Sequence, residues 1–203
     1  MRVWVAAQRG IAAIVLVLLL PVLLAIGLAV RLDSKGPAIY RARRVGQHGV
    51  AITVHKFRTM AWSPDQSPGS AITALDDGRV TRAGRRLRSA HLDELPQLWD
   101  VVVGRMALVG PRPEAPEFVD RRDERWTEIL SVPPGITGAT QLAFADEAKE
   151  LVGPDPARTY REEVLPLKIR ADLDYVRRRS VLWDLRIALA TILRSRSRNK
   201  LTS

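Results

Sequence analysis

The chain has 203 residues, of which 32 are Lys or Arg and 22 are Asp or Glu, giving a formal net charge of +10. This length fits one domain with its own core plus a short appendage and is too short for two ordinary domains. The chain has no cysteine, which excludes disulfides and thiolate metal sites, so any metal must bind oxygen or histidine ligands. The positive charge favours an anionic partner, namely nucleic acid, anionic lipid or a phosphorylated small molecule.

The first predicted element is an uncharged apolar run from Ile11 to Val30, about 30 Å long as a straight helix and long enough to enter a bilayer. It exceeds the ~7–15 residues of a signal-peptide core. Pro21 lies mid-run, where it breaks a helix, and basic residues flank both ends. If both flanks stay in the cytoplasm, residues 1–32 form a re-entrant helix-break-helix in the membrane, bent at Pro21. A straight spanning helix is the alternative.

The following segment predicts short β structure and then a loop. Residues 51–57, "AITVHKF", are typical of a short strand that presents the basic side chains Lys56 and Arg58. Residues 61–78 are rich in Ser, Pro, Gly and Asp, so we expect a mobile loop that acts either as a lid or as a passive linker.

The rest of the chain is predicted to be mainly helical. Helices are expected over 82–90, 93–103, 114–130, 160–179 and 181–193, with a short buried strand at 106–110 and a turn-rich segment at 132–142. The last helix has a broad apolar face that suits either a membrane interface or core packing. We therefore predict a mostly helical α+β fold, with amphipathic interfacial helices around a small catalytic domain at 33–203.

Two adjacent acids, Asp93 and Glu94, stand just before Pro96 within an arginine-rich stretch. Because proline is tolerated in the first turn of a helix, the pair should lie at a helix N-terminus, where it could serve only as a cap. The surrounding arginines favour a functional role, since they would keep Asp93 ionised with a lowered pKa and bind phosphate beside it. Adjacent carboxylates suit Mg²⁺, which binds one or two carboxylates plus phosphate oxygens.

Four segments together resemble the bacterial sugar transferases of the monotopic phosphoglycosyl transferase superfamily, in its minimal catalytic-domain form. They are "RARRVGQHGVAITVHKFRTM", "DDGRVTRAGRRLRSAHLDELPQLWDVVVGRMALVGPRPE", "VPPGITGATQ" and "DLDYVRRRSVLWDLRIALAT". With the hydrophobic N-terminus they cover nearly the whole chain, and several motifs in order are more specific than any one alone.

The resemblance implies transfer of a phosphosugar from a nucleotide diphosphate sugar, usually a UDP-sugar, to polyprenol (undecaprenyl) phosphate, with release of UMP. The reaction would initiate surface glycan assembly at the bacterial cell membrane. The protein would be inserted in the cytoplasmic leaflet and in contact with membrane lipid, with its catalytic domain facing the cytoplasm. Downstream glycosyltransferases are candidate partners, and no nucleic acid partner is expected.

The resemblance also implies roles for particular residues. Asp93 would be the nucleophile that forms a phosphosugar-aspartyl intermediate, and Glu94 would support the Mg²⁺ site. Residues in the family motifs that are candidates for substrate and phosphate binding are Lys56, Arg58, Arg79, Arg88, Arg112 and Asp172.

The chain departs from the family pattern at Arg105, where an acidic residue is common, and at Ala107, where Ser is common. Leu20 replaces the Ser that usually precedes Pro21, which removes a hydroxyl able to bond carbonyls freed at the break. The rival function is a membrane-tethered basic module that binds anionic lipid or nucleic acid without catalysis, but aromatic residues are only 5% and no nucleic-acid motif is present.

Overall fold

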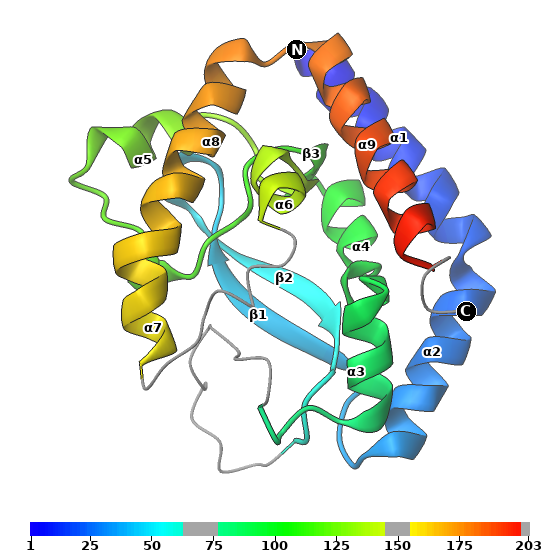
Figure 1. The fold of residues 1–203 in the computed structure, drawn as a ribbon. Helices are drawn as coiled ribbons and strands as arrows, with labels where there is room; N and C mark the ends of the chain where they lie inside the picture. The colour runs from blue at the N-terminus through cyan, green and yellow to red at the C-terminus, as the bar shows by residue number, and fades with distance from the viewer. Residues whose placement is uncertain (63–76, 145–154, 200–203) are drawn as a thin grey trace.

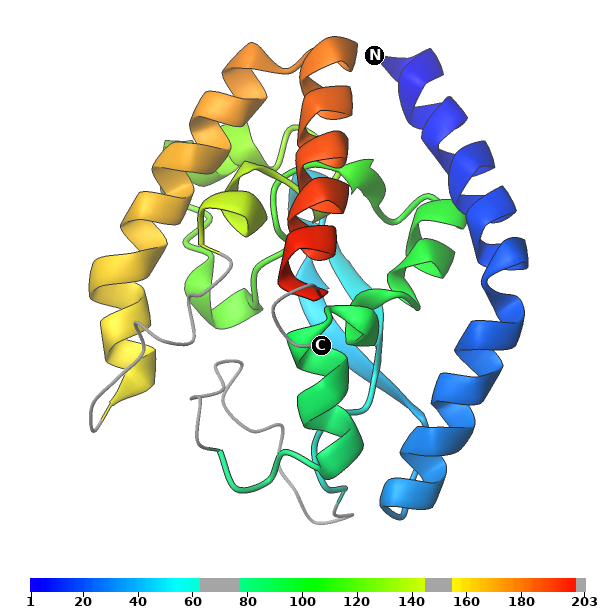
Figure 2. The same cartoon turned by 45° about the vertical axis from the view of Figure 1, so that its right-hand side comes forward.

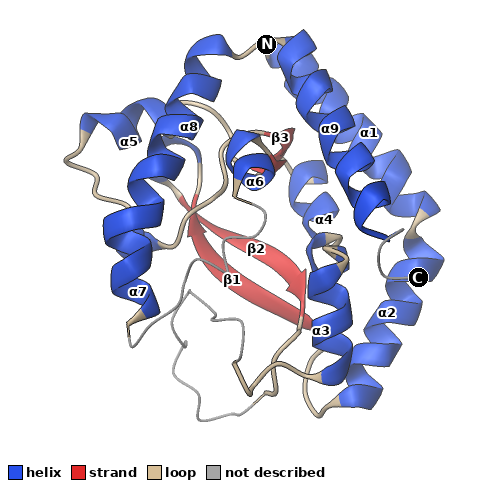
Figure 3. Cartoon of the chain, viewed as in Figure 1, coloured by secondary structure: helices blue, strands red, loops and turns tan. Residues whose placement is uncertain are grey.

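The computed structural model of the chain describes residues 1–62, 77–144 and 155–199. It is mostly helical with short strands, so the predicted α+β class is confirmed (Figure 3). The predicted loop at 61–78 falls largely outside the described residues. In chain order the helices and strands are α1 Arg2–Leu18, α2 Leu20–Asp33, β1 Ile39–Val45, β2 Ala51–Phe57, α3 Arg82–Ser89, α4 Gln97–Val102, β3 Ala107–Val109, α5 Glu124–Ile129, β4 Gly135–Thr137, α6 Ala139–Ala143, α7 Pro156–Thr159, α8 Leu165–Arg178 and α9 Val181–Asn199.

The apolar N-terminal segment forms two helices, α1 and α2, which meet at Leu19 at an angle of 63°. Pro21 explains the break, because it has no N–H for the carbonyl of Val17 and its ring clashes with that carbonyl in a straight helix. Within the described residues no single helix has the length and hydropathy of a membrane span, whereas the bent pair satisfies both together. Many apolar side chains of the pair are exposed, including Ile14, Val17, Leu18, Leu24, Leu28 and Leu32.

The antiparallel hairpin of β1 and β2 forms the floor of the molecule's centre (Figure 1). The register runs from Ile39 opposite Phe57 to Val45 opposite Ala51. Ala42 and Val54 are buried on the face that packs against Ala12 of α1 and Leu98 of α4. Strand β2 confirms the prediction for 51–57, whereas β1 was not predicted, because its arginines hide the alternation of apolar and polar residues.

A second, parallel pair joins β3 to β4, with Ala107 opposite Gly135 and Val109 opposite Thr137. The backbones approach so closely that a Cβ on Gly135 would lie 2.1 Å from the amide nitrogen of Gly110. Gly135 is therefore required by packing. The short strand predicted at 106–110 is confirmed, and the turn-rich segment at 132–142 also contains β4 and α6.

The predicted helix over 114–130 is wrong for most of its length. The structure has a single 3₁₀ turn at Pro116–Phe118 and the short helix α5. Asp123 starts α5 afresh, because its side chain caps the amide of Arg125. Helix α5 then buries Trp126 and Ile129 against Ile169 and Leu173 of α8, together with other members of this core cluster. The predicted C-terminal helices are confirmed as α8, preceded by a π-helical turn at Tyr160–Val164, and α9.

A buried carboxylate joins the two ends of the described chain. Asp184 of α9 has no exposed surface, and it accepts hydrogen bonds from Trp4 Nε1 of α1 at 2.8 Å and from the Tyr175 hydroxyl of α8 at 2.7 Å. Figure 2 shows the first turns of α1 and α9 close together at the top of the molecule. Beyond this junction α9 buries Ile187 but exposes Leu182, Leu185 and Leu189.

Candidate active site

An open cavity of about 2320 Å³ lies above the β1–β2 hairpin. Its walls are the α1–α2 pair, the segment from α3 to α4, the loop after β3, and parts of α6 and α9. Sites for single small ligands measure about 300–1,000 Å³, so this cavity has room for more than one substrate. One wall is apolar and includes Leu23, Leu24 and Leu28 of α2, whereas the floor carries charged residues.

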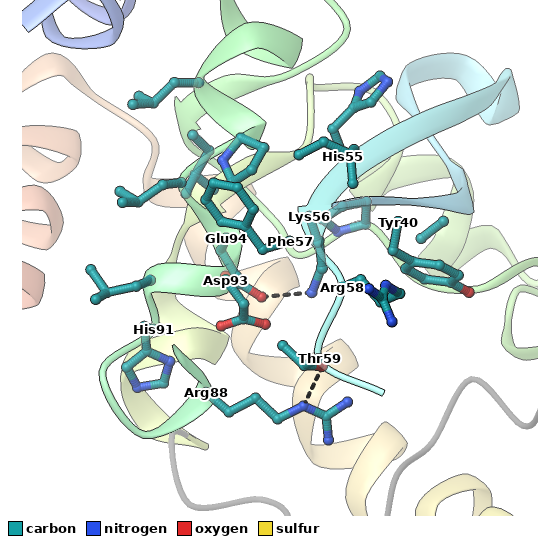
Figure 4. Close-up of a pocket in the computed structure, with 18 of the residues that line it drawn as sticks. Tyr40, His55, Lys56, Phe57, Arg58, Thr59, Arg88, His91, Asp93 and Glu94 are labelled. Atoms are coloured by element: carbon teal, nitrogen blue, oxygen red, sulfur yellow. Dashed lines mark hydrogen bonds and ion pairs between the residues drawn. The ribbon is translucent and has the colours of Figure 1, made fainter. Parts of the chain in front are cut away.

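Asp93 and Glu94 project into this cavity from a short 3₁₀ helix, Leu92–Glu94 (Figure 4). His91 precedes it in the left-handed conformation, φ 55°, and turns the chain sharply after α3. Pro96 follows as the N-cap of α4. The predicted position of the acids before a helix N-terminus is therefore correct. Helix α4 is shorter than the helix predicted over 93–103. Side chains from neighbouring elements lie on both sides of the two acids.

Glu94 is held by two cations. Its Oε1 accepts hydrogen bonds from Lys56 Nζ at 2.7 Å and from Arg112 Nη2 at 2.8 Å. Burial opposes ionisation of Glu94, but the charges of Arg112 and Lys56 outweigh it and hold the pKa well below its usual range. The structure therefore brings together Lys56 and Arg112, two of the predicted phosphate-binding residues, on one carboxylate oxygen.

Asp93 differs from its neighbour, and the predicted lowering of its pKa is wrong. Burial raises the pKa of Asp93, although Lys56 and Arg88 act in the opposite direction. Within the described residues no hydrogen bond reaches its carboxylate. Asp93 is therefore a carboxylate with little ground-state stabilisation facing an open cavity, a condition that suits a nucleophile.

Two further predicted arginines lie below the acids. Arg88 is half-buried, and its Nε donates to Thr59 Oγ1 at 2.8 Å while its charge faces Asp93 (Figure 4). Arg79 lies at the cavity rim, where it forms a fork with Asp77, with Nη2–Oδ2 at 2.6 Å and Nε–Oδ1 at 2.9 Å. Phosphate would reach Arg88 directly but would compete with Asp77 for Arg79.

Arg58 also lines the cavity, but its guanidinium is bonded to the end of α2. Its guanidinium is buried and donates to Ser34 Oγ at 2.6 Å, to Pro37 O at 2.7 Å, to Ser34 O at 2.8 Å and to Val30 O at 3.3 Å. These carbonyls end α2 and the loop after it. In this structure Arg58 therefore caps α2 and fixes the N-terminal helix pair to β2, and it does not join the cations around Glu94.

Asp172 lies behind the cavity wall in a buried polar layer. The Thr140 hydroxyl oxygen is 3.0 Å from Asp172 Oδ1, and burial raises the pKa of Asp172 to about 7. Nearby, Lys168 forms an ion pair with Glu114 at 2.8 Å, and the Tyr160 hydroxyl donates to the same Glu114 oxygen at 2.7 Å. Thr140, Lys168 and Glu114 line the cavity, whereas Asp172 lies one layer deeper.

The structure also explains one departure from the family pattern. Arg105 lies 3.3 Å from Asp100, a fully buried carboxylate that also accepts the backbone N–H of His55 at 2.8 Å. The positive charge of Arg105 is thus balanced by Asp100, away from Asp93 and Glu94. The other two departures involve uncharged residues: Ala107 is buried within β3, and Leu20 is the first residue of α2.

The prediction of site residues missed Arg44, among other residues of the cavity. Arg44 of β1 lines the cavity on the same hairpin face as Lys56, because side chains two residues apart on a strand share a face and Tyr40 is opposite Lys56. A strand prediction for 39–45 would have placed it there. The three arginines of "RARR", together with Arg31 and Lys35, instead suggested only a membrane-flanking charge.

Asp93 and Glu94 could supply the protein ligands of the expected magnesium ion, with water and substrate phosphate supplying the others. Among the residues that the structure describes, no group of three or more His, Asp or Glu side chains could enclose a metal. Magnesium, however, keeps several waters and takes one or two carboxylates together with substrate phosphate oxygens. Asp93 and Glu94 supply two adjacent carboxylates of this kind beside phosphate-binding cations.

Two adjacent carboxylates, the cations around them and an adjoining apolar wall form an arrangement that suits an enzyme transferring a phosphorylated group. The sequence profile described as bacterial sugar transferase matches residues 5–198. The chain belongs to the bacterial sugar transferase family.

Curated relatives agree with this assignment. The UDP-glucose:undecaprenyl-phosphate glucose-1-phosphate transferase of Caulobacter vibrioides is 39% identical over 184 residues, 89% of this chain and 65% of that protein. The exopolysaccharide production protein PSS of Rhizobium leguminosarum bv. phaseoli is 35% identical over 199 residues, 91% of this chain and 90% of that protein. The UDP-N-acetylgalactosamine-undecaprenyl-phosphate N-acetylgalactosaminephosphotransferase of Aeromonas hydrophila is 34% identical, covering 89% of this chain and 40% of that protein. The chain thus spans less than two thirds of the first and third of these relatives.

Proposed function

We propose that the protein transfers a phosphosugar from a UDP-sugar to undecaprenyl phosphate, giving undecaprenyl diphosphate sugar and UMP. The observation that carries this proposal is the cavity itself, in which Asp93, Lys56, Arg88 and Arg112 share one space with the apolar wall of α2. A nucleotide diphosphate needs the cations and a polyprenyl chain needs the apolar wall. Relatives named for this reaction with glucose and N-acetylgalactosamine support the substrate classes.

The proposed mechanism has two displacements at one phosphorus atom. The Asp93 carboxylate attacks the sugar-bearing phosphate, and the bond to the bridging oxygen breaks so that UMP leaves with the electron pair. A phosphate oxygen of undecaprenyl phosphate then attacks the same phosphorus, and the bond to Asp93 breaks. No net proton is needed if the acceptor enters as its dianion. The raised pKa of Asp93 reflects a weakly stabilised carboxylate, which favours its attack.

The cations have separate tasks in this mechanism. Arg88 and Arg112 would bind phosphate oxygens and stabilise the charge that develops during each displacement. Lys56 and Arg112 also keep Glu94 ionised and fixed. Bound Mg²⁺, held by Asp93 and Glu94, would neutralise phosphate charge and orient the donor.

The membrane position is part of the proposal. The bent α1–α2 pair would enter the cytoplasmic leaflet and return, so that Asp93 faces the cytoplasm at the level of the acceptor phosphate. Exposed apolar residues on both helices and on α9 support this placement, as do the basic residues on both flanks. Single cysteines at Val3 and Lys35, both exposed, should be protected from an impermeant thiol reagent in intact cells. Labelling of Val3→Cys alone would indicate a spanning segment.

The chemical test is release of UMP from a panel of UDP-sugars, with undecaprenyl phosphate and Mg²⁺ present. Without acceptor, one UMP per enzyme should be released, and intact-protein mass spectrometry should detect an added phosphosugar. Asp93→Asn should abolish both signals, whereas Glu94→Gln should still form the adduct, only slowly. An active enzyme that never gains mass would refute the covalent step. No UMP release from any UDP-sugar would favour the rival basic binding module.

A further inference from the structure

Arg44 is a cation of the cavity to which the proposed mechanism gives no task. It lies near the end of β1, where Val45 donates its backbone N–H to the carbonyl of Glu114 at 2.9 Å. This bond fixes Arg44 beside the segment Arg112–Glu114. The guanidinium is half-buried and lines the cavity.

Among the residues that the structure describes, Arg44 forms no ion pair with a carboxylate. In the part of the chain that the structure describes, its guanidinium makes one hydrogen bond, from Nη1 to the carbonyl of Arg43 at 3.1 Å. Five N–H donors are available on a guanidinium, so most of its donor capacity is not used by the protein. Of the two carboxylates whose charges act on Arg44, Glu114 already accepts from Lys168 and Tyr160, and Glu117 is exposed and forms no ion pair with Arg44 among the described residues.

The charge of Arg44 is also opposed by its surroundings. Burial lowers its pKa and the positive charge of Arg112 lowers it further, although Glu114, Tyr40 and Glu117 act in the opposite direction. Two guanidiniums that influence each other electrostatically in a partly dry site repel, and an anion bound between them opposes this repulsion. A phosphate group removes this repulsion and satisfies the planar donor forks of both side chains.

The position of Arg44 indicates which phosphate it meets. Strand β1 starts next to the membrane helices, where Ile39 packs with Val30 and Leu23 of α2. Arg44 is four residues further along the strand from Tyr40, about 13 Å, at the end that contacts Glu114. In Figure 1 the hairpin runs from α2 and α3 towards α5 and α8. Arg44 therefore lies on the side of the cavity distant from the apolar wall.

We propose that Arg44 and Arg112 together bind the nucleotide-side phosphate of the donor, the phosphate that leaves as UMP. The acceptor phosphate, tethered to a lipid chain, approaches from the α2 side, so it meets Asp93 and Arg88 first. This assignment rests on the proposed function and adds a phosphate-binding residue to it. The nucleotide and the lipid chain then extend towards opposite ends of one cavity, while both phosphates react in turn at the same phosphorus beside Asp93.

The test compares Arg44→Gln with the wild type and with Arg122→Gln, which removes the same charge from a side chain that is 93% exposed and outside the cavity. We expect Arg44→Gln to raise KM for the UDP-sugar about 10- to 100-fold, the usual cost of a charge-assisted hydrogen bond. KM for undecaprenyl phosphate should stay within about twofold of the wild type. Arg44→Lys keeps the positive charge but loses the planar guanidinium, so its KM for the UDP-sugar should lie between those of the wild type and Arg44→Gln.

A binding measurement makes the result independent of turnover. In the Asp93→Asn background, which retains the cations, Arg44→Gln should weaken binding of UMP by a similar factor, whereas Arg122→Gln should not. Unchanged UMP binding and donor KM in an active enzyme would overturn the inference and leave the proposed function intact. A rise in acceptor KM alone would assign Arg44 to the lipid phosphate, which would also overturn it. A wild type that releases no UMP would instead refute the proposed function.

Discussion

Asp172→Asn should remove a pH-dependent loss of stability. The Thr140 hydroxyl oxygen is 3.0 Å from both Asp172 Oδ1 and Gln141 Oε1, yet a hydroxyl can donate only one proton. A protonated Asp172 resolves this conflict by donating to Thr140, which then donates to Gln141. Only 4% of the Asp172 surface is exposed, and burial raises its pKa to about 7. Asparagine at this position imitates the neutral acid and keeps the donor.

The size of the effect follows from the two pKa values. Asp172 has a pKa of about 7 in the folded protein against an ordinary value of 3.8. Because the folded state holds the proton more tightly, the stability from this group is complete below pH 3.8 and is lost as pH rises to about 7. At ~1.36 kcal/mol per unit, the loss reaches up to about 4 kcal/mol above pH 7. For a chain of this length, that corresponds to roughly 10 °C in Tm.

The assay is thermal unfolding of wild type and Asp172→Asn in the same detergent or nanodisc between pH 4.5 and pH 8. The variant should gain in Tm relative to the wild type as pH rises, and the gain should level off above pH 7. Asp174→Asn, on the exposed side of the same helix, is the control and should follow the wild type. A constant difference across the pH range would refute the reasoning, because it would mean that Asp172 is already ionised throughout.

Three other variants test the arrangement around the site. Arg112→Lys should keep the positive charge but lower kcat/KM at least about 10-fold with little change in Tm, because lysine cannot contact Glu94 and phosphate in one plane; kinetics like those of the wild type would leave Arg112 with a structural role only. Arg58→Lys should destabilise the protein by about 3 kcal/mol in thermal unfolding, since it loses most of the hydrogen bonds that cap α2. A higher KM for the UDP-sugar at unchanged Tm would instead indicate that Arg58 binds phosphate. Trp4→Phe should lower stability by about 1–3 kcal/mol, because Asp184 then loses a buried donor, and an unchanged Tm would show that water replaces it.

The sequence predicted most strongly the features that local chemistry determines. Pro21 sets the bend of α1 and α2, because a missing N–H and a ring clash act within one turn. Pro96 likewise marks the start of α4, with Asp93 and Glu94 immediately before it. The periodicity of apolar residues predicted α8 and α9, and α8 buries Leu165, Ile169 and Leu173 on one face.

Features that depend on tertiary partners could not be predicted in this way. Lys56 lies in β2 and Arg58 directly follows the end of that strand, yet Arg58 caps α2 and Lys56 binds Glu94, because different elements lie beside them. The pKa of Asp93 was predicted in the wrong direction because burial, invisible in the sequence, outweighs the arginines around it. The failed helix at 114–130 has the same origin, since Glu114 is held by Lys168 and Tyr160 from a distant helix.

The contact between Trp4 and Asp184 can form only late in the synthesis of the protein. The two residues are 180 positions apart, and ribosomes add about 5–20 residues per second, so roughly 10–40 s separate their synthesis. The backbone N–H of Leu108, which donates to Gln8, is made earlier, so helix α1 can dock on β3 before its first turn is secured. The indole N–H of Trp4 can bond to Asp184 only after α9 is made, so a nascent chain halted before Asp184 would carry the bent α1–α2 pair without this hydrogen bond. The first turn of α1 is therefore secured to the rest of the protein only after α9 has been made.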